Sequence, residues 1–350
     1  MKKPILAALA LCYALGAAAQ TPDTAAPEGY RFTDVKILPV TPVKDQSRSG
    51  TCWCYSTLSF LESEILRAGG PELDLSEMWI VRNIYFEKAV KYVRLHGSLN
   101  LAVGGQAHDV LHGIEAYGIV PEEVYPGLNY GYDKPNFDEI DAVIKAYADA
   151  VIKAGGKRSD SRLTTAWQAG LNGILDAYFG PMPGKFTYRG REYTPASFAA
   201  SLPIDLGDYI EFTSFTHHPF YTEFAMEVPD NWNWDKVWNV PLDEFMQIID
   251  NSLEKGYTIS WGTDVSEKGF SRTKGLGIVP EADLEGMQIV GTATDQNGTP
   301  YYKVKNSWNT TGPYDGYWYF SRPFVAYKTM TVLVNKNAVP KAILKKIGVK

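Results

Sequence analysis

The residue in this sequence best suited to covalent chemistry is Cys52, because of the string around it. That string runs Gln46-Ser-Arg-Ser-Gly-Thr-Cys-Trp-Cys-Tyr-Ser56. Gly50 marks a loop, and apolar residues at helical spacing follow it, so Cys52 is predicted at the N-terminus of a helix. Unpaired backbone N–H groups and the positive end of the helix dipole favour a thiolate there. A thiolate is the nucleophile that acyl transfer needs.

Two residues near Cys52 have different predicted roles. Gln46, on the loop before the helix, is a candidate to donate its side-chain amide to a developing oxyanion, together with the backbone N–H of Cys52. Cys54 forms a Cys-x-Cys pair with Cys52, a pattern that metal and redox sites also use. Residues i and i+2 of a helix point in different directions, however. We therefore expect Cys54 to pack in the core, and we predict no metal and no other cofactor.

The composition of the chain excludes several classes of protein. Only three of its 350 residues are cysteines, which excludes a disulfide scaffold. The net charge is −6 and no block of Lys or Arg is present, so we expect no nucleic-acid partner. Hydrophobic residues make up 45% of the chain, enough to bury a core. This length suits one large domain or two lobes.

Residues 1–19 are typical of a secretory signal peptide. Two lysines precede the apolar run 5–19, which ends in three alanines that form a small-residue cleavage site. The run is too short and too rich in alanine to span about 30 Å of hydrocarbon. Cys12 leaves a lipoprotein as the alternative, although the residue before it is not the small one that lipidation favours. We expect an exported protein, periplasmic or extracellular, with no membrane attachment after cleavage.

The rest of the chain changes character once. Residues 20–34 form a polar leader without periodicity, expected to be mobile. Helical spacing and stop signals then predict helices over residues 52–66, 76–95 and 107–117. Residues 127–203 have the composition of an inserted surface element that includes a helix over 140–154. From residue 204 short β-rich runs follow, at 209–215, 257–261, 288–294, 301–308 and 317–320.

Helices first and strands second predict an α+β chain of two lobes. One domain, 35–350, would then contain a helical lobe over 35–126 and an antiparallel β lobe over 204–350, with the insertion between them. Asp295-Gln-Asn-Gly298 is a hairpin signal within the β lobe. The Trp-rich segment 232–238 is expected to be a packed connection between the lobes rather than a carbohydrate platform. A site between the lobes would draw on both ends of the sequence.

The string around Cys52 resembles the local signature of the papain superfamily of cysteine peptidases, Cys-Gly-[Ser/Ala]-Cys-[Trp/Tyr]. Ser49 stands in place of the first, disulfide-forming cysteine, a departure that points to the bleomycin hydrolase and aminopeptidase C branch. Asn306, in Lys-Asn-Ser-Trp, follows Cys52 by about 250 residues, against about 130–150 in papain-like enzymes. The branch carries insertions of that kind. It also shares the strings Leu75-Ser-Glu77, Gly104-Gly105, 213–221, 256–262 and 266–270.

The resemblance implies a papain-like two-lobe fold and a cysteine aminopeptidase that acts on peptides with a free N-terminus. It implies that Asn306 holds an imidazole by a hydrogen bond and that Trp308 shields this bond from water. Gly104 and Gly105 are implied to line the cleft and to bond the substrate backbone. The terminal carboxylate of Lys350 is implied to pair with the substrate's amine. The family often forms closed oligomers, so the resemblance also allows a homo-oligomer.

The resemblance breaks at the position of the family's histidine. Where the family has a His-Gly-Met type of string, this chain has Glu285-Gly-Met. An imidazole, with a pKa of about 6.5, takes the thiol proton and later returns one to the leaving amine. A carboxylate, with a pKa of about 4.3, is a poor acid at neutral pH, and its charge raises the pKa of a nearby thiol. We therefore predict strongly impaired turnover. The alternative to an enzyme is an inactive papain fold that binds peptides or a protein partner.

None of the five histidines of the chain is a convincing replacement. His217 and His218 are expected to form a hydrogen-bonded structural pair at a strand end, and His96 to lie in a loop. His108 and His112 are an i, i+4 pair, a spacing that also binds metal ions. Because no acidic ligand string accompanies them, we expect a solvated or substrate-lining face of a helix.

Overall fold

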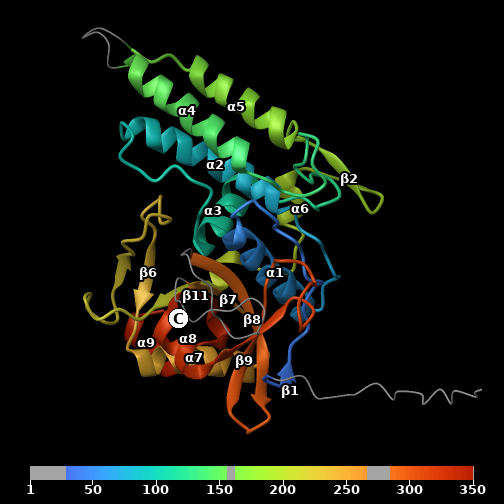
Figure 1. Ribbon diagram of the computed structural model, residues 1–350, viewed down its shortest axis with the longest axis vertical. Coiled ribbons are helices and arrows are strands. Elements are labelled where there is room, and N and C mark those ends of the chain that lie inside the picture. The colour runs from blue at the N-terminus through green and yellow to red at the C-terminus, as the bar shows by residue number, and fades with distance from the viewer. Residues whose placement is uncertain (1–28, 156–161, 266–283, 350) are drawn as a thin grey trace, which may run out of the picture.

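Two lobes, each with its own hydrophobic core, make up the protein (Figure 1). The computed structural model describes residues 29–155, 162–265 and 284–349, with only the backbone described at residues 284 and 285. One core is built from the N-terminal helices and the other from the strands and helices of the C-terminal half. The α+β class predicted from the sequence is confirmed. No helix in the described part of the chain is long and apolar enough to cross a membrane.

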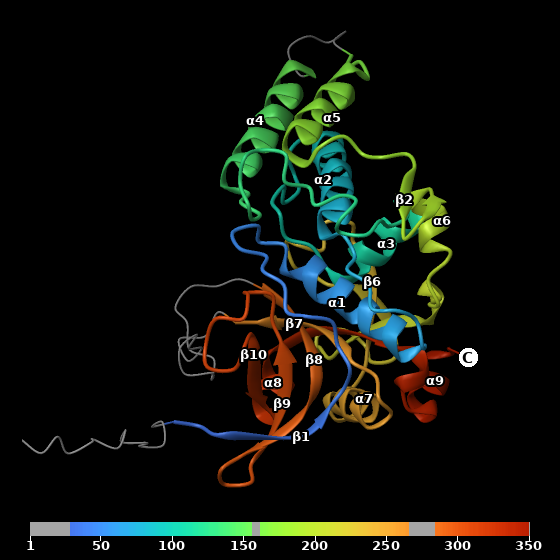
Figure 2. The same ribbon diagram turned by 90° about the vertical axis from the view of Figure 1, so that its right-hand side faces the viewer.

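The helix α1 (Cys52–Arg67) lies between the two lobes (Figures 1 and 2). Every residue from Cys52 to Ile65 is buried. A helix covered on all sides needs apolar or internally bonded residues all round, and the sequence of α1 supplies them. It contacts the helices α2 and α3 on one side and the strands β7 and β8 on the other. Its N-terminus therefore lies where the two lobes meet.

The helical lobe is completed by α2 (Glu77–Arg94) and α3 (Ala107–Tyr117). The hydroxyl of Ser76 caps α2 by accepting a hydrogen bond from the backbone N–H of Trp79 at 3.0 Å. Gln106 and Asp109 form a capping box at the start of α3, and Gly118 ends it. These three helices match the predicted ranges to within one or two residues.

The inserted element forms a second layer on the helical lobe. The helices α4 (Asp138–Gly155) and α5 (Ala166–Phe179) pack on α2, as Figure 1 shows. A short hairpin follows, made of β2 (Phe186–Tyr188) and β3 (Arg191–Tyr193). The helix α6 (Pro195–Ala199) then packs on α3. Buried apolar residues at helical spacing explain how α4 packs: Ile140, Ile144, Ala148 and Val151.

The C-terminal lobe is built on a sheet of nine strands. Its order is β10-β9-β8-β7-β11-β4-β6-β5, with β1 on β8. The strands are β1 (Phe32–Ile37), β4 (Tyr209–Thr213), β5 (Glu223–Ala225), β6 (Lys236–Asn239), β7 (Ile259–Asp264), β8 (Leu284–Asp295), β9 (Pro300–Lys305), β10 (Tyr317–Ser321) and β11 (Thr329–Asn335). The helices α7 (Leu242–Glu254), α8 (Arg322–Lys328) and α9 (Lys341–Ile347) pack with this sheet.

Two features of the sheet differ from the sequence prediction. The lobe is not purely antiparallel, because β4 and β6 pair in parallel. The leader also ends earlier than expected: β1 begins at Phe32 and pairs with β8, so residues 32–34 belong to the sheet. Phe32 anchors this strand by stacking on Tyr319 with 4.1 Å between the ring centroids. Residues 1–28, including the predicted signal peptide, lie outside the described residues.

The predicted hairpin between β8 and β9 is confirmed. Asp295 donates its backbone N–H to the carbonyl of Thr299 at 3.0 Å. Gly298 has φ +81°, a conformation that favours glycine. The side chain of Asp295 accepts the backbone N–H groups of Asn297 and Thr299, both at 2.8 Å. This turn fixes the register of the two strands that lead to residues 285 and 306.

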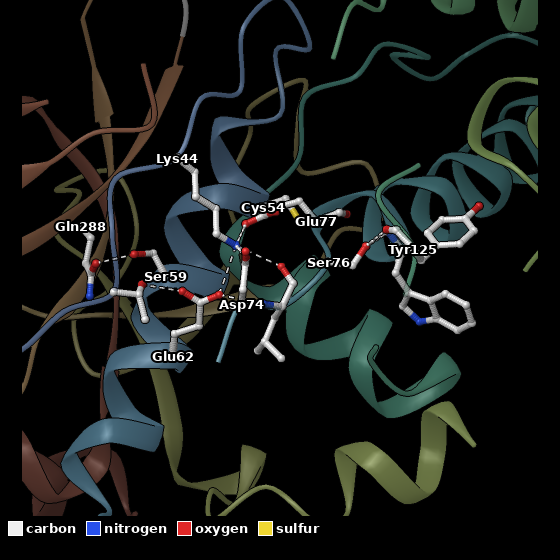
Figure 3. A network of polar contacts seen from close by, with 12 residues as sticks. Lys44, Cys54, Ser59, Glu62, Asp74, Ser76, Glu77, Tyr125 and Gln288 are labelled. Atoms are coloured by element: carbon white, nitrogen blue, oxygen red, sulfur yellow. Dashed lines mark hydrogen bonds and ion pairs between the residues drawn. The ribbon is translucent and has the colours of Figure 1, made fainter. Parts of the chain in front are cut away.

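A buried cluster of charges joins the N-terminal loop to α1 and α2 (Figure 3). The ammonium of Lys44 lies 3.2 Å from Glu62 Oε1, 2.7 Å from Glu77 Oε1 and 2.6 Å from Asp74 Oδ1. The side chains of Glu62 and Glu77 are 0% and 2% exposed. Burial opposes the charge of Lys44, but the surrounding carboxylates outweigh burial and raise its pKa well above the usual value. One cation therefore neutralises carboxylates from both helices.

We predict that Lys44→Met destabilises the protein by about 3–5 kcal/mol, because it leaves two buried carboxylates without their cation. The measurement is urea unfolding at neutral pH. Lys134→Met is the matched control, since Lys134 pairs with Asp45 at 2.8 Å while its side chain is 61% exposed. Solvent screens that exposed pair, so its loss is expected to have little effect on stability. Equal losses in the two variants would contradict the role given to Lys44.

Candidate functional site

Cys52 is the first residue of α1, as predicted. The N-cap residue, Thr51, makes no side-chain cap, so no hydroxyl of the cap competes for the first N–H groups of the helix. Gly50 has φ +64°, and a Cβ there would lie 2.6 Å from Val103 Cγ2. Only glycine fits this turn without a shift of Val103. The turn therefore places the thiol at the positive end of α1.

A small cavity of about 30 Å³ between the lobes contains Cys52 in its wall. Gly105, Gln106 and Ala107 line it from the helical lobe, and Trp53 and Ser56 line it from α1. The sheet contributes Ser260, Trp261, Gly262, Gly286, Met330 and Thr331. The predicted meeting of the two halves of the chain at one site is thus present in the structure.

Gly104 and Gly105 lie on the wall of the helical lobe opposite the sheet, but only Gly105 lines the cavity. A Cβ on Gly105 would lie 2.7 Å from Trp53 and 2.9 Å from Asp109 Oδ2, so the backbone lies directly on the side chain of Trp53. A side chain on Gly104 would collide with the carboxylate of Asp230. The carbonyl of Gly104 accepts a hydrogen bond from the buried Lys88 ammonium. Both glycines are therefore required by close packing.

Gln46 is buried and held in one orientation by Ser307. Its backbone N–H donates to the carbonyl of Ser307 at 2.8 Å, and its Oε1 accepts the Ser307 hydroxyl at 2.6 Å. With Oε1 occupied, the remaining polar group of the side chain is the Nε2 donor. An oxyanion hole requires such a fixed donor. The sequence did not identify Ser307 as the residue that orients Gln46, although Ser307 is part of the Lys-Asn-Ser-Trp string.

Asn306 directly follows β9 and is 3% exposed. Its Oδ1 accepts the backbone N–H of Ser307 at 2.7 Å. Its Nδ2 is buried and has no hydrogen-bond partner among the described residues. A buried unsatisfied donor is uncommon and needs an acceptor. Trp308 lies nearby, with its ring edge-on to Trp318 at 5.7 Å between centroids. Asn306 and Trp308 thus lie near each other, and the Nδ2 donor of Asn306 has no partner among the described residues.

The backbone of Glu285 lies in β8, opposite Thr263 of β7. The next residue, Gly286, makes the closest approach of this strand to α1. A Cβ on Gly286 would lie 2.8 Å from the carbonyl oxygen of Cys52, 2.8 Å from Trp53 Cα and 2.7 Å from Ser56 Oγ. Residue 285 is therefore adjacent to the contact between β8 and the start of α1. Its side chain lies outside the described part of the structure.

Four of the five histidines bond carboxylates. All five are described, and none lines the Cys52 cavity. His112 bonds Glu87 at 2.9 Å, and His217 and His218 both bond Glu227, at 3.2 and 2.6 Å. The described lining of the Cys52 cavity therefore contains no imidazole.

His108 is the histidine whose environment the sequence prediction described wrongly. Instead of facing solvent, its side chain is 14% exposed, and its Nδ1 bonds Glu211 Oε2 of the sheet lobe at 2.7 Å. Burial opposes protonation, but the charge and hydrogen bond of Glu211 outweigh burial and raise the pKa of His108 to about 9. The reason for the error is tertiary: Glu211 is distant in sequence, and helical spacing on α3 alone cannot reveal it.

Cys54 is fully buried and packs in the helical core, as predicted. Its Sγ lies 3.5 Å from the carbonyl of Glu77. Burial raises the pKa of its thiol well above the usual value, followed by the effect of the Glu77 charge. A buried thiol of this kind is inert. Cys52 and Cys54 form no disulfide with each other.

Lys350, the predicted carrier of a substrate-binding carboxylate, lies outside the described residues. The two residues before it, Gly348 and Val349, line a separate groove with Lys255, Lys336 and Lys345. None of these residues lines the Cys52 cavity. The role given to Lys350 stays a prediction.

A loop beside Gly104 crosses from the sheet lobe to the helical lobe. It joins β5 to β6, over residues 226–235. Trp232, 2% exposed, packs in the helical core, and Lys91 of α2 lies 3.9 Å from the ring centroid of Trp234. Asn100 donates to Asp230 Oδ1 at 3.3 Å. We call residues 226–235 the crossing loop. The prediction of a packed connection between the lobes holds for Trp232, whereas Trp234 is 55% exposed.

We predict that Gly286→Ala destabilises the protein by about 1–3 kcal/mol, because the added methyl group pushes β8 away from the start of α1. Urea unfolding measures this loss. Gly173→Ala in α5 is the matched control: a Cβ there meets nothing within 4 Å. Because alanine is the better helix former, the control is expected to be neutral or more stable by up to about 1 kcal/mol. A neutral Gly286→Ala would contradict the close contact.

Comparisons with known proteins agree with this geometry. A family model described as papain family cysteine protease matches residues 26–139. The chain is 22% identical to aminopeptidase G and 23% identical to aminopeptidase C of Lactobacillus delbrueckii subsp. lactis. Each alignment covers 87% of this chain, with 83% and 81% of the relatives covered. The solved structure of pepw from Lactobacillus rhamnosis superposes with a TM-score of 0.71 at 21% identity, covering 90% of this chain and 84% of the other. Residues 26–139 thus match the papain family of cysteine proteases, and most of the chain is similar to aminopeptidases C and G.

Proposed function

We propose that the protein is a cysteine aminopeptidase that releases N-terminal residues from peptides through an acyl-enzyme on Cys52. The observation that carries this proposal is the position of Cys52 at the start of α1, in the wall of a cavity shared by both lobes. The relatives named aminopeptidase C and G support the same activity. We also propose that the protein is exported, on the strength of residues 1–19. The substrate is a peptide, and no cofactor enters the scheme.

In this mechanism the thiolate of Cys52 attacks the carbonyl carbon of the first peptide bond and forms a tetrahedral oxyanion. The backbone N–H of Cys52 and Nε2 of Gln46 stabilise that oxyanion. The C–N bond then breaks, the amine leaves with a proton, and a thioester remains. Water attacks the thioester, releases the amino acid and returns the thiol. Gln46 is prepared for its part because Ser307 occupies its Oε1.

The proton transfers are the weak part of this scheme. The leaving amine needs a proton donor, and the position that carries histidine in the family carries Glu285. A carboxylate holds few protons at neutral pH. No histidine lines the cavity, and its described lining contains no titratable side chain apart from Cys52. We therefore propose that the enzyme turns over slowly at neutral pH and that proton transfer limits the rate.

The crossing loop supports removal of single residues over internal cleavage. It spans the space between the lobes next to Gly104, where a longer substrate would continue along the helical lobe. We propose that the loop leaves room for few residues before the cut bond. The proposed role of Lys350 would add a charge for the substrate's amine but is not required for this limit.

A second candidate function is peptide binding without turnover. The residue type at position 285 favours it, since a carboxylate next to a thiolate gives neither a proton donor nor charge stabilisation. The same cavity would then hold a peptide by the backbone of Gly105 and the apolar walls of Trp53 and Trp261.

We predict that Glu285→His raises kcat/KM on aminoacyl fluorogenic substrates by about 10²–10⁴-fold, the usual contribution of general acid–base catalysis. Wild type is expected to show low turnover that Cys52→Ala abolishes. Wild type equal to Cys52→Ala, with Glu285→His active, would support the binding function instead. Fast wild-type turnover that depends on Cys52 would contradict the proposed limit on proton transfer.

A further inference from the structure

We propose that His108, Asp109 and Asp235 form a binding site for a divalent metal ion, with Zn²⁺ as the ion whose preferences fit best. Each residue offers one ligand atom, and these atoms lie within 4.8 Å of one another. One imidazole and two carboxylates are ligands that zinc accepts, with water in the remaining position. The site lies where α3 meets the crossing loop, behind Gly104 and Gly105.

The imidazole of His108 is oriented as a metal ligand would be. Its Nδ1 is bonded to Glu211 Oε2 at 2.7 Å, so Nε2 is the atom that would bind an ion, with release of its proton. This Nε2 is buried and has no hydrogen-bond partner among the described residues. A carboxylate that holds one ring nitrogen while the other binds the metal is the common outer-shell arrangement of zinc histidines.

Asp109 supplies the second, independent observation. The residue is 0% exposed. Its Oδ2 accepts the backbone N–H of Gln106 at 2.8 Å, while Oδ1 is buried and unpartnered in the described structure. Burying an unpaired carboxylate oxygen is costly unless a cation or a water molecule satisfies it. His108 Nε2 and Asp109 Oδ1, two buried atoms without a hydrogen-bond partner in the described structure, thus belong to adjacent residues of the proposed site.

Asp235 provides the third ligand and the route of entry. Its carboxylate is 40% exposed and lies 3.9 Å from His108 Nε2. The backbone N–H of Asp235 donates to Asn231 Oδ1 at 3.1 Å, and Asn233 Nδ2 donates to Asp235 Oδ2 at 3.0 Å. These bonds fix the end of the crossing loop. An ion can reach the buried atoms from the solvent side of this carboxylate.

The charge around the site also favours a cation. Glu211, Asp109 and Asp235 bring three carboxylates to a single imidazole. Lys88 and Lys91 supply positive charge nearby, but they contact other groups: Lys88 donates to the carbonyls of residues 102 and 104, and Lys91 lies over Trp234. A divalent ion would neutralise the excess charge and join α3, β4 and the crossing loop.

A second cluster in the described structure could also attract zinc and must be separated in the test. His217, His218 and Glu227 lie close together, but both imidazole Nε2 atoms already bond Glu227. The His217 and Glu227 side chains are 55% and 61% exposed. This described cluster contains no buried polar atom without a hydrogen-bond partner, so the cluster serves as the control.

The test is titration of the full chain with ZnCl₂, followed by calorimetry and by thermal unfolding. Cys52→Ala is used as the background for every variant, because a reactive thiolate binds zinc itself. We expect one Zn²⁺ per chain bound at the proposed site and a higher Tm with zinc. Co²⁺ in place of Zn²⁺ is expected to give ligand-field absorption bands. These readouts do not depend on peptidase activity, so they test the metal site independently of the proposed function.

Variants locate the ion. His108→Gln and Asp235→Asn are expected to weaken binding at least tenfold, and Glu211→Gln by about 10–100-fold through loss of the outer-shell bond. The double variant His217→Gln/His218→Gln is expected to retain one Zn²⁺. Three outcomes would overturn the proposal: no saturable binding, unchanged binding in His108→Gln and Asp235→Asn, or complete loss in the double variant. If His108→Gln fails to fold, the other two single variants decide the question.

Discussion

The structure depends on the burial of α1 between two lobes that each have a separate core. Because both faces of α1 are covered, its N-terminus is fixed where the helical lobe meets the sheet. Cys52, the first residue of α1, therefore lies at that junction. The contact that sets the spacing is made by Gly286, which lies against the backbone of Cys52 and Trp53. Glycine at this position lets β8 and α1 approach as closely as backbone atoms permit. Moving either element would change the distance between the thiol and residue 285.

The other features of the site follow from this arrangement. The cluster around Lys44 holds the loop that carries Gln46 against α1 and α2, and Ser307 then fixes the amide of Gln46. The sheet supplies Asn306 and Trp308 at the end of β9. The described lining of the cavity contains no imidazole. The protein thus combines a positioned thiol and a positioned oxyanion donor with a glutamate at the position of the family's general base.

Local patterns predicted much of this arrangement. Apolar spacing predicted helix starts at residues 52, 76 and 107, against 52, 77 and 107 in the structure, and the Asn-Gly turn located the β8–β9 hairpin. Those local patterns could not predict contacts between segments that are distant in sequence. The pairing of Phe32 with β8 and of His108 with Glu211 depends on partners more than one hundred positions away. The orientation of Gln46 by Ser307 needed three-dimensional contact as well, although both residues had been placed near the site.

The most direct test of a positioned thiol without an imidazole is the pH dependence of Cys52 alkylation by iodoacetamide, measured on wild type and on Glu285→His. The account predicts that the wild-type rate rises in a single step with ionisation of the thiol alone. In Glu285→His an additional reactive form is expected at acid pH, from a thiolate paired with an imidazolium. A wild-type thiol that already reacts rapidly at acid pH, and whose reaction disappears in Cys52→Ala, would contradict the account.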